Sequence, residues 1–199
     1  DKSMDLVLEA GDRWPWVAND RRAVIAMSLI AFINGSPGEA LGMLEGLDDS
    51  PAVVYLRGMC HEDLGETLKA AARYQETAER WPESDLRDPA MFAKADIFLR
   101  AGAYRSAAEE MARVSERSRR GDIRDEASLR EAVAVYLEGE VDSSATLLRR
   151  VINSLRGGTV AARAQFLLGE ALFSKGDYQN AIVEYNRVLS DYFEHDLAA

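Results

Sequence analysis

Cys60 and His61 are the residues whose types could together support nucleophilic catalysis, because an imidazole can activate a thiol. They are adjacent in a segment with helical periodicity, where neighbouring side chains point about 100° apart and do not meet. The only other histidine, His195, lies near the C-terminus. We therefore interpret Cys60 as a small buried residue and His61 as a partly exposed helix residue, and we predict no catalytic nucleophile.

Paired carboxylates could serve acid–base chemistry or metal binding. They occur at Asp48-Asp49, Glu62-Asp63, Glu109-Glu110 and Asp125-Glu126. An acidic helical protein produces such pairs without a site, and none has the spacing of a calcium loop, which needs a glycine and a distal glutamate. Gly157-Gly158 lacks the lysine that follows in a phosphate-binding loop. The sequence predicts no enzyme, no metal and no cofactor.

Charge and composition exclude further classes. The net charge of −10 over 199 residues disfavours nucleic-acid binding, which needs a basic surface. A single cysteine excludes an intramolecular disulfide. No stretch reaches the roughly 18 apolar residues of a membrane span, and the N-terminus lacks the pattern of a signal peptide. We expect membrane association only through segments outside this chain.

A glycine recurs at a constant interval of 37 residues, at Gly65, Gly102, Gly139 and Gly176. A small residue stands seven positions before each glycine: Gly58, Ala95, Ala132 and Gly169. Another follows by five positions: Ala70, Ala107, Ser144 and Ala181. A large apolar residue follows by nine: Tyr74, Met111, Leu148 and Tyr185. An earlier copy around Ser28 and Gly35 has a spacing of 30 to the next. Self-similarity at a fixed period indicates a repeat architecture.

Each copy has the pattern of two helices joined at the recurring glycine. Apolar residues follow helical spacing, and the glycine accepts the left-handed conformation that ends a helix. Asp177 is expected to cap the helix after Gly176. Alternation typical of strands is almost absent. We predict an all-α fold, a right-handed superhelical α-solenoid of antiparallel helix pairs with about eleven helices.

The copies are expected to span residues 20–48, 51–82, 88–119, 124–156 and 160–193, with a half-repeat over 3–15. The helix over Ser3–Ala10 is interpreted as the second helix of an incomplete copy, and Asp196–Ala199 as the start of a further first helix. Residues 1–199 are thus expected to form a single solenoid cut from a longer array.

These positions resemble the tetratricopeptide repeat, whose signature is W-x2-L-G-x2-Y, then A-x3-F, then P. The last copy keeps Leu168, Gly169, Leu172, Ala181 and Tyr185, with Phe193 in place of proline. The second copy keeps Gly58, Ala70, Tyr74 and Pro82. The resemblance covers about residues 20 to 195. It implies a non-catalytic scaffold that binds a partner protein or peptide.

The period exceeds the usual 34 residues of the family by three. We expect the extra residues between the second helix of one copy and the first helix of the next. Segments such as 81–86 and 192–199 resemble the long turns of the bacterial outer-membrane assembly lipoprotein and the Tol–Pal coordinator. This resemblance favours a periplasmic or cell-envelope location over the cytoplasm.

The resemblance also implies that the first helix of each pair lines a concave groove. The expected groove positions are Tyr55, Met59, Phe92, Asp96, Leu99, Leu129, Tyr136, Phe166 and Phe173. They are mostly apolar or acidic, which favours an extended or helical apolar peptide and disfavours the basic clamp that holds a carboxylate terminus. The alternative is that these residues pack one first helix against the next.

Arginines cluster around residues 113–130: Arg113, Arg117, Arg119, Arg120, Arg124 and Arg130. They could form a positive strip for an acidic partner, but acidic residues lie among them, so we favour ion-paired helix ends. Two alternative functions stay open. The chain could self-associate through open array ends, or it could be the accessory repeat domain of a larger envelope enzyme or export machine.

Overall fold

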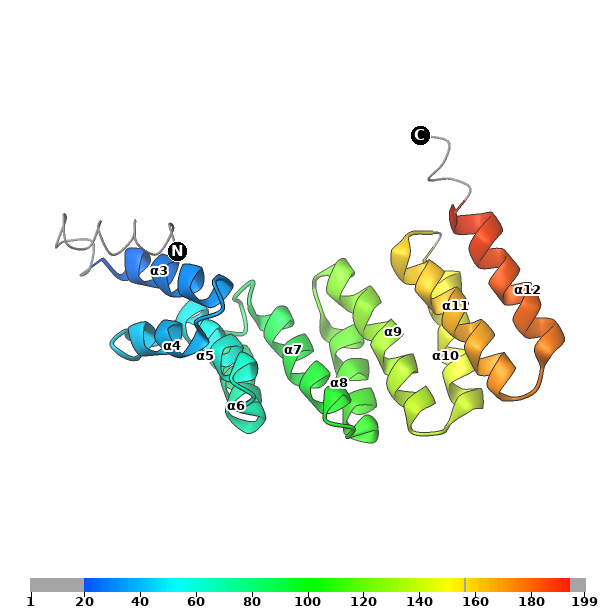
Figure 1. Ribbon diagram of the computed structural model, residues 1–199, viewed down its shortest axis with the longest axis horizontal. Coiled ribbons are helices and arrows are strands. Elements are labelled where there is room, and N and C mark those ends of the chain that lie inside the picture. Colours follow the sequence, from blue (N-terminus) through cyan, green and yellow to red (C-terminus); the bar gives the residue numbers. More distant parts are fainter. Residues whose placement is uncertain (1–19, 156, 194–199) are drawn as a thin grey trace. The chain divides into compact units, whose positions relative to one another are not determined.

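The computed structural model describes residues 20–155 and 157–193, which form ten α-helices, one short π-helical segment and no strand (Figure 1). The helices are α3 (Arg21–Ile33), α4 (Pro37–Glu45), α5 (Pro51–Asp63), α6 (Thr67–Arg80), α7 (Arg87–Arg100), α8 (Tyr104–Arg117), α9 (Gly121–Leu137), α10 (Val141–Ser154), α11 (Thr159–Ser174) and α12 (Tyr178–Val188), followed by η1 (Leu189–Phe193). The all-α prediction is confirmed. The predicted helix over Ser3–Ala10 and the predicted start at Asp196–Ala199 lie outside the described residues.

A glycine in the left-handed region ends the first helix of every pair. Gly35, Gly65, Gly102, Gly139 and Gly176 have φ angles between 74° and 98°. At Gly65 the amide donates to the carbonyl of Glu62 at 2.9 Å, and the next amide, of Glu66, donates to that of His61 at 2.8 Å. Such bonds satisfy carbonyls that would otherwise be orphaned at the helix end. The spacing of 37 therefore marks a physical stop signal, as predicted.

Side-chain caps fix several helix starts. Asp20 accepts a hydrogen bond from the amide of Arg22 in α3, and Ser50 accepts one from that of Val53 in α5. Asp177 accepts one from the amide of Asn180, which confirms its predicted role before α12. These oxygens pair with the free amides of the first helical turn.

The chain divides into two compact units, residues 1–94 and 95–199, and the boundary falls within α7. In unit 1, α3 packs on α4, α5 on α6, and α4 and α3 both contact α5. A cluster of buried side chains joins these helices: Ala31, Ala40, Leu44, Val53, Leu56 and Cys60. That the two units form a single right-handed solenoid stays a prediction.

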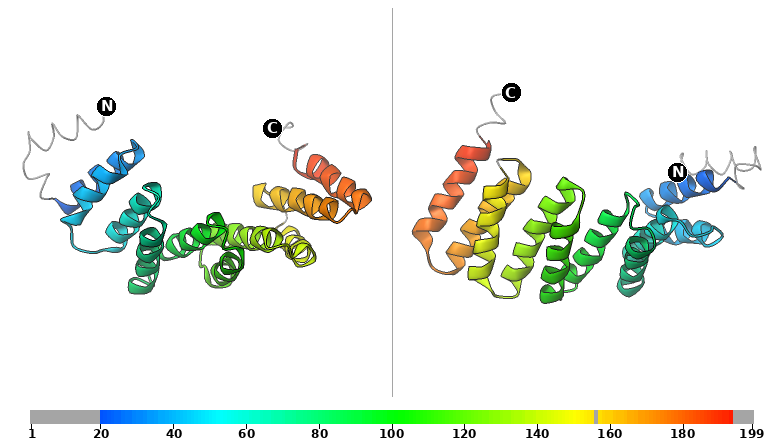
Figure 2. Two further views of the ribbon diagram at one scale, coloured as in Figure 1. Left: turned by 60° about the horizontal axis from the view of Figure 1, so that its bottom comes forward. Right: turned by 180° about the vertical axis from the view of Figure 1, so that it is seen from behind.

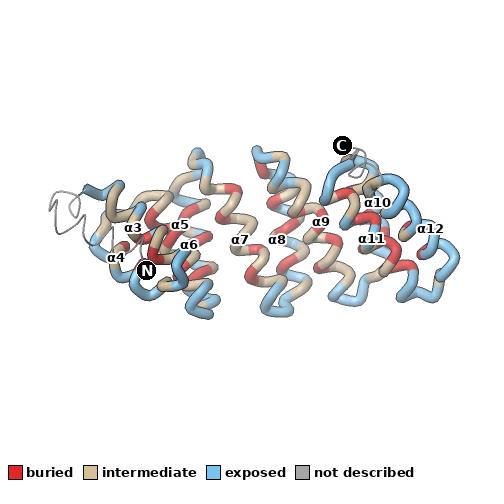
Figure 3. Tube along the Cα trace, turned by 45° about the horizontal axis from the view of Figure 1, so that its top comes forward, coloured by how far each residue is buried: buried red, intermediate tan, exposed pale blue. Residues whose placement is uncertain are grey.

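In unit 2, α8 contacts α9, and α9 to α12 lie side by side in chain order (Figure 2). The first helices α9 and α11 also contact each other directly. One core cluster runs through both pairs and includes Leu129, Leu148, Val151, Ala164 and Leu168. Figure 3 shows buried residues along the facing sides of α9, α10 and α11, and mostly exposed residues on α12. The apolar content is thus used between neighbouring helices, as a repeat fold requires.

The three residues beyond the usual period are placed differently from copy to copy. The turn 81–86 between α6 and α7 has six residues, as expected. The turns 118–120 and 155–158 have only three and four, while α9 and α11 are lengthened to 17 and 16 residues. The prediction of a long turn is therefore wrong after the third and fourth pairs, because the extra residues extend the start of the first helix that follows.

Two glycines allow a tyrosine of the second helix to approach the first helix closely. A methyl group at Gly58 would lie 2.9 Å from Cε1 of Tyr74, and one at Gly169 would lie 2.5 Å from Cε1 of Tyr185. Both distances are below van der Waals contact. The predicted role of the small residues seven positions before the turn glycine is confirmed at these two positions.

We expect the substitution Gly58→Ala to destabilise the protein by about 1–2 kcal/mol, although alanine is the better helix former. The added methyl group collides with the ring of Tyr74, which is almost fully buried and has little room to move. The measurement is urea unfolding followed by circular dichroism.

The matched control is Gly42→Ala in α4, where no atom lies within 4 Å of the added methyl group. Because Gly42 is exposed in a helix, this change should stabilise the protein by about 0.5–1 kcal/mol. Equal effects of the two substitutions would show that the contact between Gly58 and Tyr74 does not limit packing.

Candidate functional site

Cys60 and His61 do not form a catalytic pair. The Cys60 side chain is fully buried in the core of unit 1, and burial raises the pKa of its thiol to about 11. His61 is half-buried, and its Nδ1 lies 2.6 Å from Oε2 of Glu66 in the turn before α6. The imidazole therefore bonds to a carboxylate of the turn, which supports the structural interpretation of both residues.

Neither a cluster of metal-ligating side chains nor a helix able to span a membrane occurs among the described residues. Nowhere in residues 20–155 and 157–193 do three histidine, cysteine or acidic side chains converge as a metal site would require. Over the same residues, no helix has the length and apolar character needed to cross a membrane.

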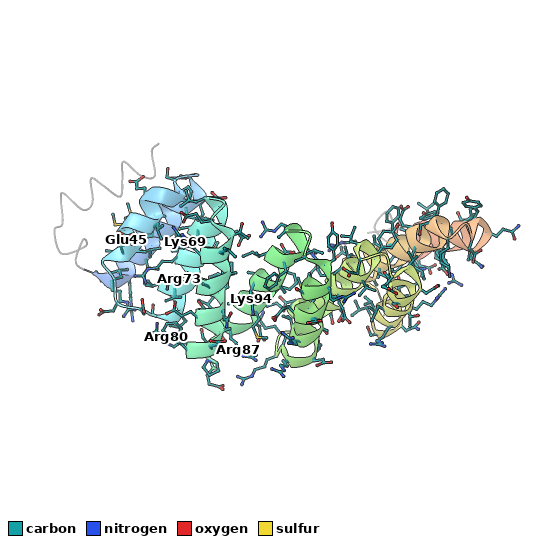
Figure 4. All side chains as sticks on the ribbon, turned by 90° about the horizontal axis from the view of Figure 1, so that it is seen from below. Glu45, Lys69, Arg73, Arg80, Arg87 and Lys94 are labelled. Atoms are coloured by element: carbon teal, nitrogen blue, oxygen red, sulfur yellow. The ribbon has the colours of Figure 1, made fainter. Side chains whose placement is uncertain are left out.

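The basic residues labelled in Figure 4 lie on α6 and on the part of α7 up to Lys94. Arg80 donates to Oδ2 of Asp49 at 2.7 Å and also pairs with Glu76, which accepts a hydrogen bond from Arg73 at 2.6 Å. Arg80, together with Arg57, holds the pKa of Asp49 below its ordinary value. These arginines are engaged in an ion-pair network, so we do not interpret them as a site for an anionic partner.

The arginines around residues 113–130 are also paired where the structure gives their partners. Arg113 donates to Glu110 at 2.7 Å, and Arg120 donates to Asp122 at 2.6 Å. Arg130 bonds to two carboxylates, as set out below. The ion-paired interpretation of this cluster is supported by these contacts.

The first-helix face of unit 2 is the surface formed by α9, α11 and the part of α7 after Lys94. Its first feature is a ladder of charges that links the three helices. Asp96 on α7 binds Arg130 on α9, and Arg130 donates to Glu126 at 3.0 Å. Glu126 also accepts a hydrogen bond from Arg163 on α11 at 2.8 Å. The ladder holds neighbouring first helices in register while leaving its side chains partly exposed.

The second feature of this face is a group of exposed aromatic residues on α11. Phe166 is 48% exposed and Phe173 is 55% exposed. Phe166 stacks on Tyr185 of α12 with ring centroids 5.6 Å apart, and Phe173 meets Tyr178 at 5.1 Å. These contacts hold the rings on the surface, where they can offer apolar area at little cost in conformational entropy.

The aromatic residues border an open hollow of about 630 Å³ between α11 and α12. Among the described residues, its lining carries one carboxylate and is otherwise aromatic or aliphatic: Phe166, Glu170, Phe173, Tyr185, Val188 and Leu189. We call this surface the C-terminal hollow. The hydroxyl of Tyr185 donates to Oε1 of Glu170 at 2.6 Å, and burial together with this carboxylate raises the pKa of Tyr185 to about 12. The tyrosine thus stays protonated and holds the carboxylate at the edge of the hollow.

The other predicted groove residues are placed unevenly. Leu129 is fully buried in the core of unit 2, so its side chain packs between helices and offers no surface to a partner. Tyr136, Asp96 and Leu99 are half-buried on the first-helix face. In unit 1, Tyr55, Met59 and Phe92 are half-buried as well: Tyr55 stacks on Tyr74 at 5.4 Å and Met59 packs against the core cluster.

Three residues of the first-helix face were not among the predicted groove positions: Glu126, Arg163 and Arg130. A signal for the first two was present, because Glu126 and Arg163 carry opposite charges one period of 37 apart. Equivalent positions of adjacent first helices face each other in the array, so opposite charges at that spacing predict an ion pair.

The fold is an α-solenoid of antiparallel helix pairs. The tetratricopeptide repeat profiles match residues 92–158 and 153–191, and a second profile of the same repeat matches residues 52–84. The chain therefore belongs to the tetratricopeptide repeat family, whose domains are typically non-catalytic modules for protein–protein interaction. No curated protein matches the chain in sequence.

Solved structures share the fold at low sequence identity. A MamA fragment from Desulfovibrio magneticus RS-1, which runs from residue 41 of MamA to its end, is 17% identical to this chain. The two structures have a TM-score of 0.69, and the match covers 84% of this chain and 92% of that one. BtubC from P. vanneervenii has 18% identity and a TM-score of 0.65, and the match covers 94% of this chain and 85% of BtubC. A putative kinesin light chain of Podosopora anserina with nearly identical TPR-like repeats has 19% sequence identity and a TM-score of 0.64. The match covers 84% of this chain and 92% of that one.

The environment of Cys60 predicts a chemically silent thiol. A rise of the pKa from 9.0 to about 11 lowers the thiolate fraction about 100-fold at pH 8, and burial blocks reagent access in addition. We expect the native protein to react with Ellman's reagent at least ~100-fold more slowly than the same protein in urea. A fast reaction of the native protein would instead make Cys60 an accessible nucleophile and reopen a catalytic interpretation.

Proposed function

We propose that the protein is a non-catalytic interaction scaffold that binds a partner peptide or protein on the first-helix face of unit 2. Membership of the tetratricopeptide repeat family supports the general function. The observation that carries the location is a contrast at one repeat position. Leu129 on α9 is fully buried, whereas Phe166, one period later on α11, is 48% exposed. Of the two side chains at this repeat position, the larger apolar one is therefore the more exposed.

The chemistry of the face supports an amphipathic partner. Phe166 and Phe173 supply apolar anchors, and Leu137 on α9 is also 45% exposed. The ladder of Glu126, Arg130 and Arg163 supplies charged groups of both signs on the same face, and Arg163 stands three residues before Phe166 on α11. Interfaces commonly combine an apolar centre with a polar rim, and large aromatic residues contribute most of the binding energy. An apolar peptide with polar flanks fits this arrangement.

A role in a bacterial cell-envelope complex remains part of the proposal. It rests on the six-residue turn 81–86, which resembles the long turns of envelope repeat proteins. Self-association and service as an accessory domain of a larger machine are the alternative functions.

We expect Phe166→Ala to abolish partner binding while costing only about 1 kcal/mol of stability, because half of the ring is already solvated. Peptides selected from a random phage library against the native protein serve as the probe. Their affinity for each variant is measured by fluorescence anisotropy, and stability is measured by urea unfolding.

Leu129→Ala is the matched control, since it alters the same repeat position one period earlier. Its side chain is fully buried, so the substitution should cost about 3 kcal/mol without removing a contact to the peptide. The proposal fails if no peptide is enriched, or if the enriched peptides bind the Phe166→Ala variant as tightly as the native protein.

A further inference from the structure

A first helix is buried on one side by the second helix that precedes it in the chain. Helix α11 contacts α10, and one core cluster joins three residues of each helix, all at most 4% exposed: Ala145, Leu148, Val151, Ala164, Leu168 and Ala171. Helices α5 and α9 contact α4 and α8 in the same way. The places of Ala164 and Ala171 are filled on these helices by residues that are also fully buried: Val53, Cys60, Ala127 and Ala134.

The same face of α3 is apolar but less covered. When the turn glycines Gly35 and Gly176 are aligned, the three cluster residues of α11 fall on Ala23, Met27 and Ile30. All three are only half-buried, and the core cluster of unit 1 reaches α3 through other residues. Among the described helices, α3 is the first in the chain. It therefore presents the seat of a preceding second helix, which α4 and α5 do not fill.

The residues before α3 carry the matching half of the cluster. In the same alignment, residues 4–10 fall on residues 145–151 of α10 without an insertion or a deletion. The places of the three cluster residues of α10 are then taken by apolar residues: Met4, Val7 and Ala10. The exposed place of Arg150 is taken by another charged residue, Glu9. This pattern predicts an amphipathic helix with one apolar side.

The connection to α3 is long enough for such a helix to fold back. The described second helices reach the next first helix through turns of five, three and four residues, at 46–50, 118–120 and 155–158. Arg13-Trp14 repeats Arg80-Trp81, where α6 ends and the guanidinium lies 4.5 Å from the centre of the indole ring. A helix that ends at Arg13 leaves the seven residues 14–20 before α3. This length permits the same antiparallel packing.

We propose that residues 3–13 form a helix whose apolar side docks on Ala23, Met27 and Ile30 of α3. The docked helix completes α3 as α10 completes α11. A segment of the same chain is favoured as the occupant because it carries apolar residues in the required register, and because its tether gives it a high effective concentration at this face. The inference is independent of the proposed function, which concerns unit 2. It also removes one open face through which copies of the chain could self-associate.

The first test joins the two helices by a disulfide. The variant Val7→Cys/Met27→Cys has both thiols at cluster places. The control Glu9→Cys/Met27→Cys has one thiol about 200° further round the segment helix. Each protein is oxidised with copper phenanthroline at low concentration, and the products are separated by non-reducing electrophoresis. Cys60 stays in place in both proteins, because it is fully buried.

We expect Val7→Cys/Met27→Cys to form an intramolecular disulfide at least ~10-fold faster than the control, because a disulfide requires β-carbons about 4 Å apart. The product should migrate as a monomer.

The second test measures whether the α3 face is covered without any cross-link. The variant Met27→Cys is combined either with Val7→Asp, which puts a charge into the contact, or with Leu8→Asp. Leu8 is the matched control because it takes the exposed place of Arg149. Ellman's reagent should react with the thiol about 10-fold faster in the Val7→Asp protein than in the Leu8→Asp protein, since a buried charge displaces the segment.

The inference is overturned if the two double-cysteine variants cross-link at equal rates, or if neither cross-links. A cross-linked dimer also overturns it, in favour of a second copy of the chain as the occupant. Equal reaction rates in the Val7→Asp and Leu8→Asp proteins would show that the segment does not cover the α3 face, and would leave that face to a partner protein. None of these outcomes affects the binding of phage-selected peptides at Phe166, so the proposed function is tested separately.

Discussion

The contact on which the rest of each pair depends is the approach of a large second-helix side chain to a small residue of the first helix. Tyr74 lies against Gly58, and Tyr185 lies against Gly169, both too close for any β-carbon. The hydroxyls of the same two tyrosines donate hydrogen bonds to Glu62 and Glu170 of the first helices, both at 2.6 Å. One packing contact therefore brings the helices together and also orients a carboxylate near the edge of the pair.

This dependence explains why so little of the fold relies on a central core. In a repeat array each pair contacts only its neighbours, so stability is a sum of contacts within pairs and between them. The largest cluster of unit 2 accordingly runs from α9 through α10 to α11. It ends at α12, where the residues equivalent to buried positions of the preceding pair become exposed. The composition of this exposed surface then determines what it can bind.

The sequence was a good guide to features set by local chemistry and a poor guide to those set by neighbours. Turn glycines, Asp177 as a cap and the small residues at Gly58 and Gly169 were predicted, since each follows from backbone geometry or close approach. Leu129 and Phe166 were treated alike because they share a repeat position, yet one is buried and the other exposed. Likewise, a constant period of 37 could not reveal whether the extra residues lengthen a turn or a helix.

The polarity of the contacts between first helices suggests how such an array selects its neighbours. The position facing the next helix is acidic on α7, apolar on α9 and acidic on α11, where Asp96, Val133 and Glu170 stand. The facing residue on the next helix changes with it, from Arg130 to Leu167. A helix placed one pair out of order would set a base against an apolar side chain, or leave a carboxylate unpaired in a partly desolvated site. Either mismatch costs free energy, so the same charges that favour the correct neighbour also disfavour the wrong one.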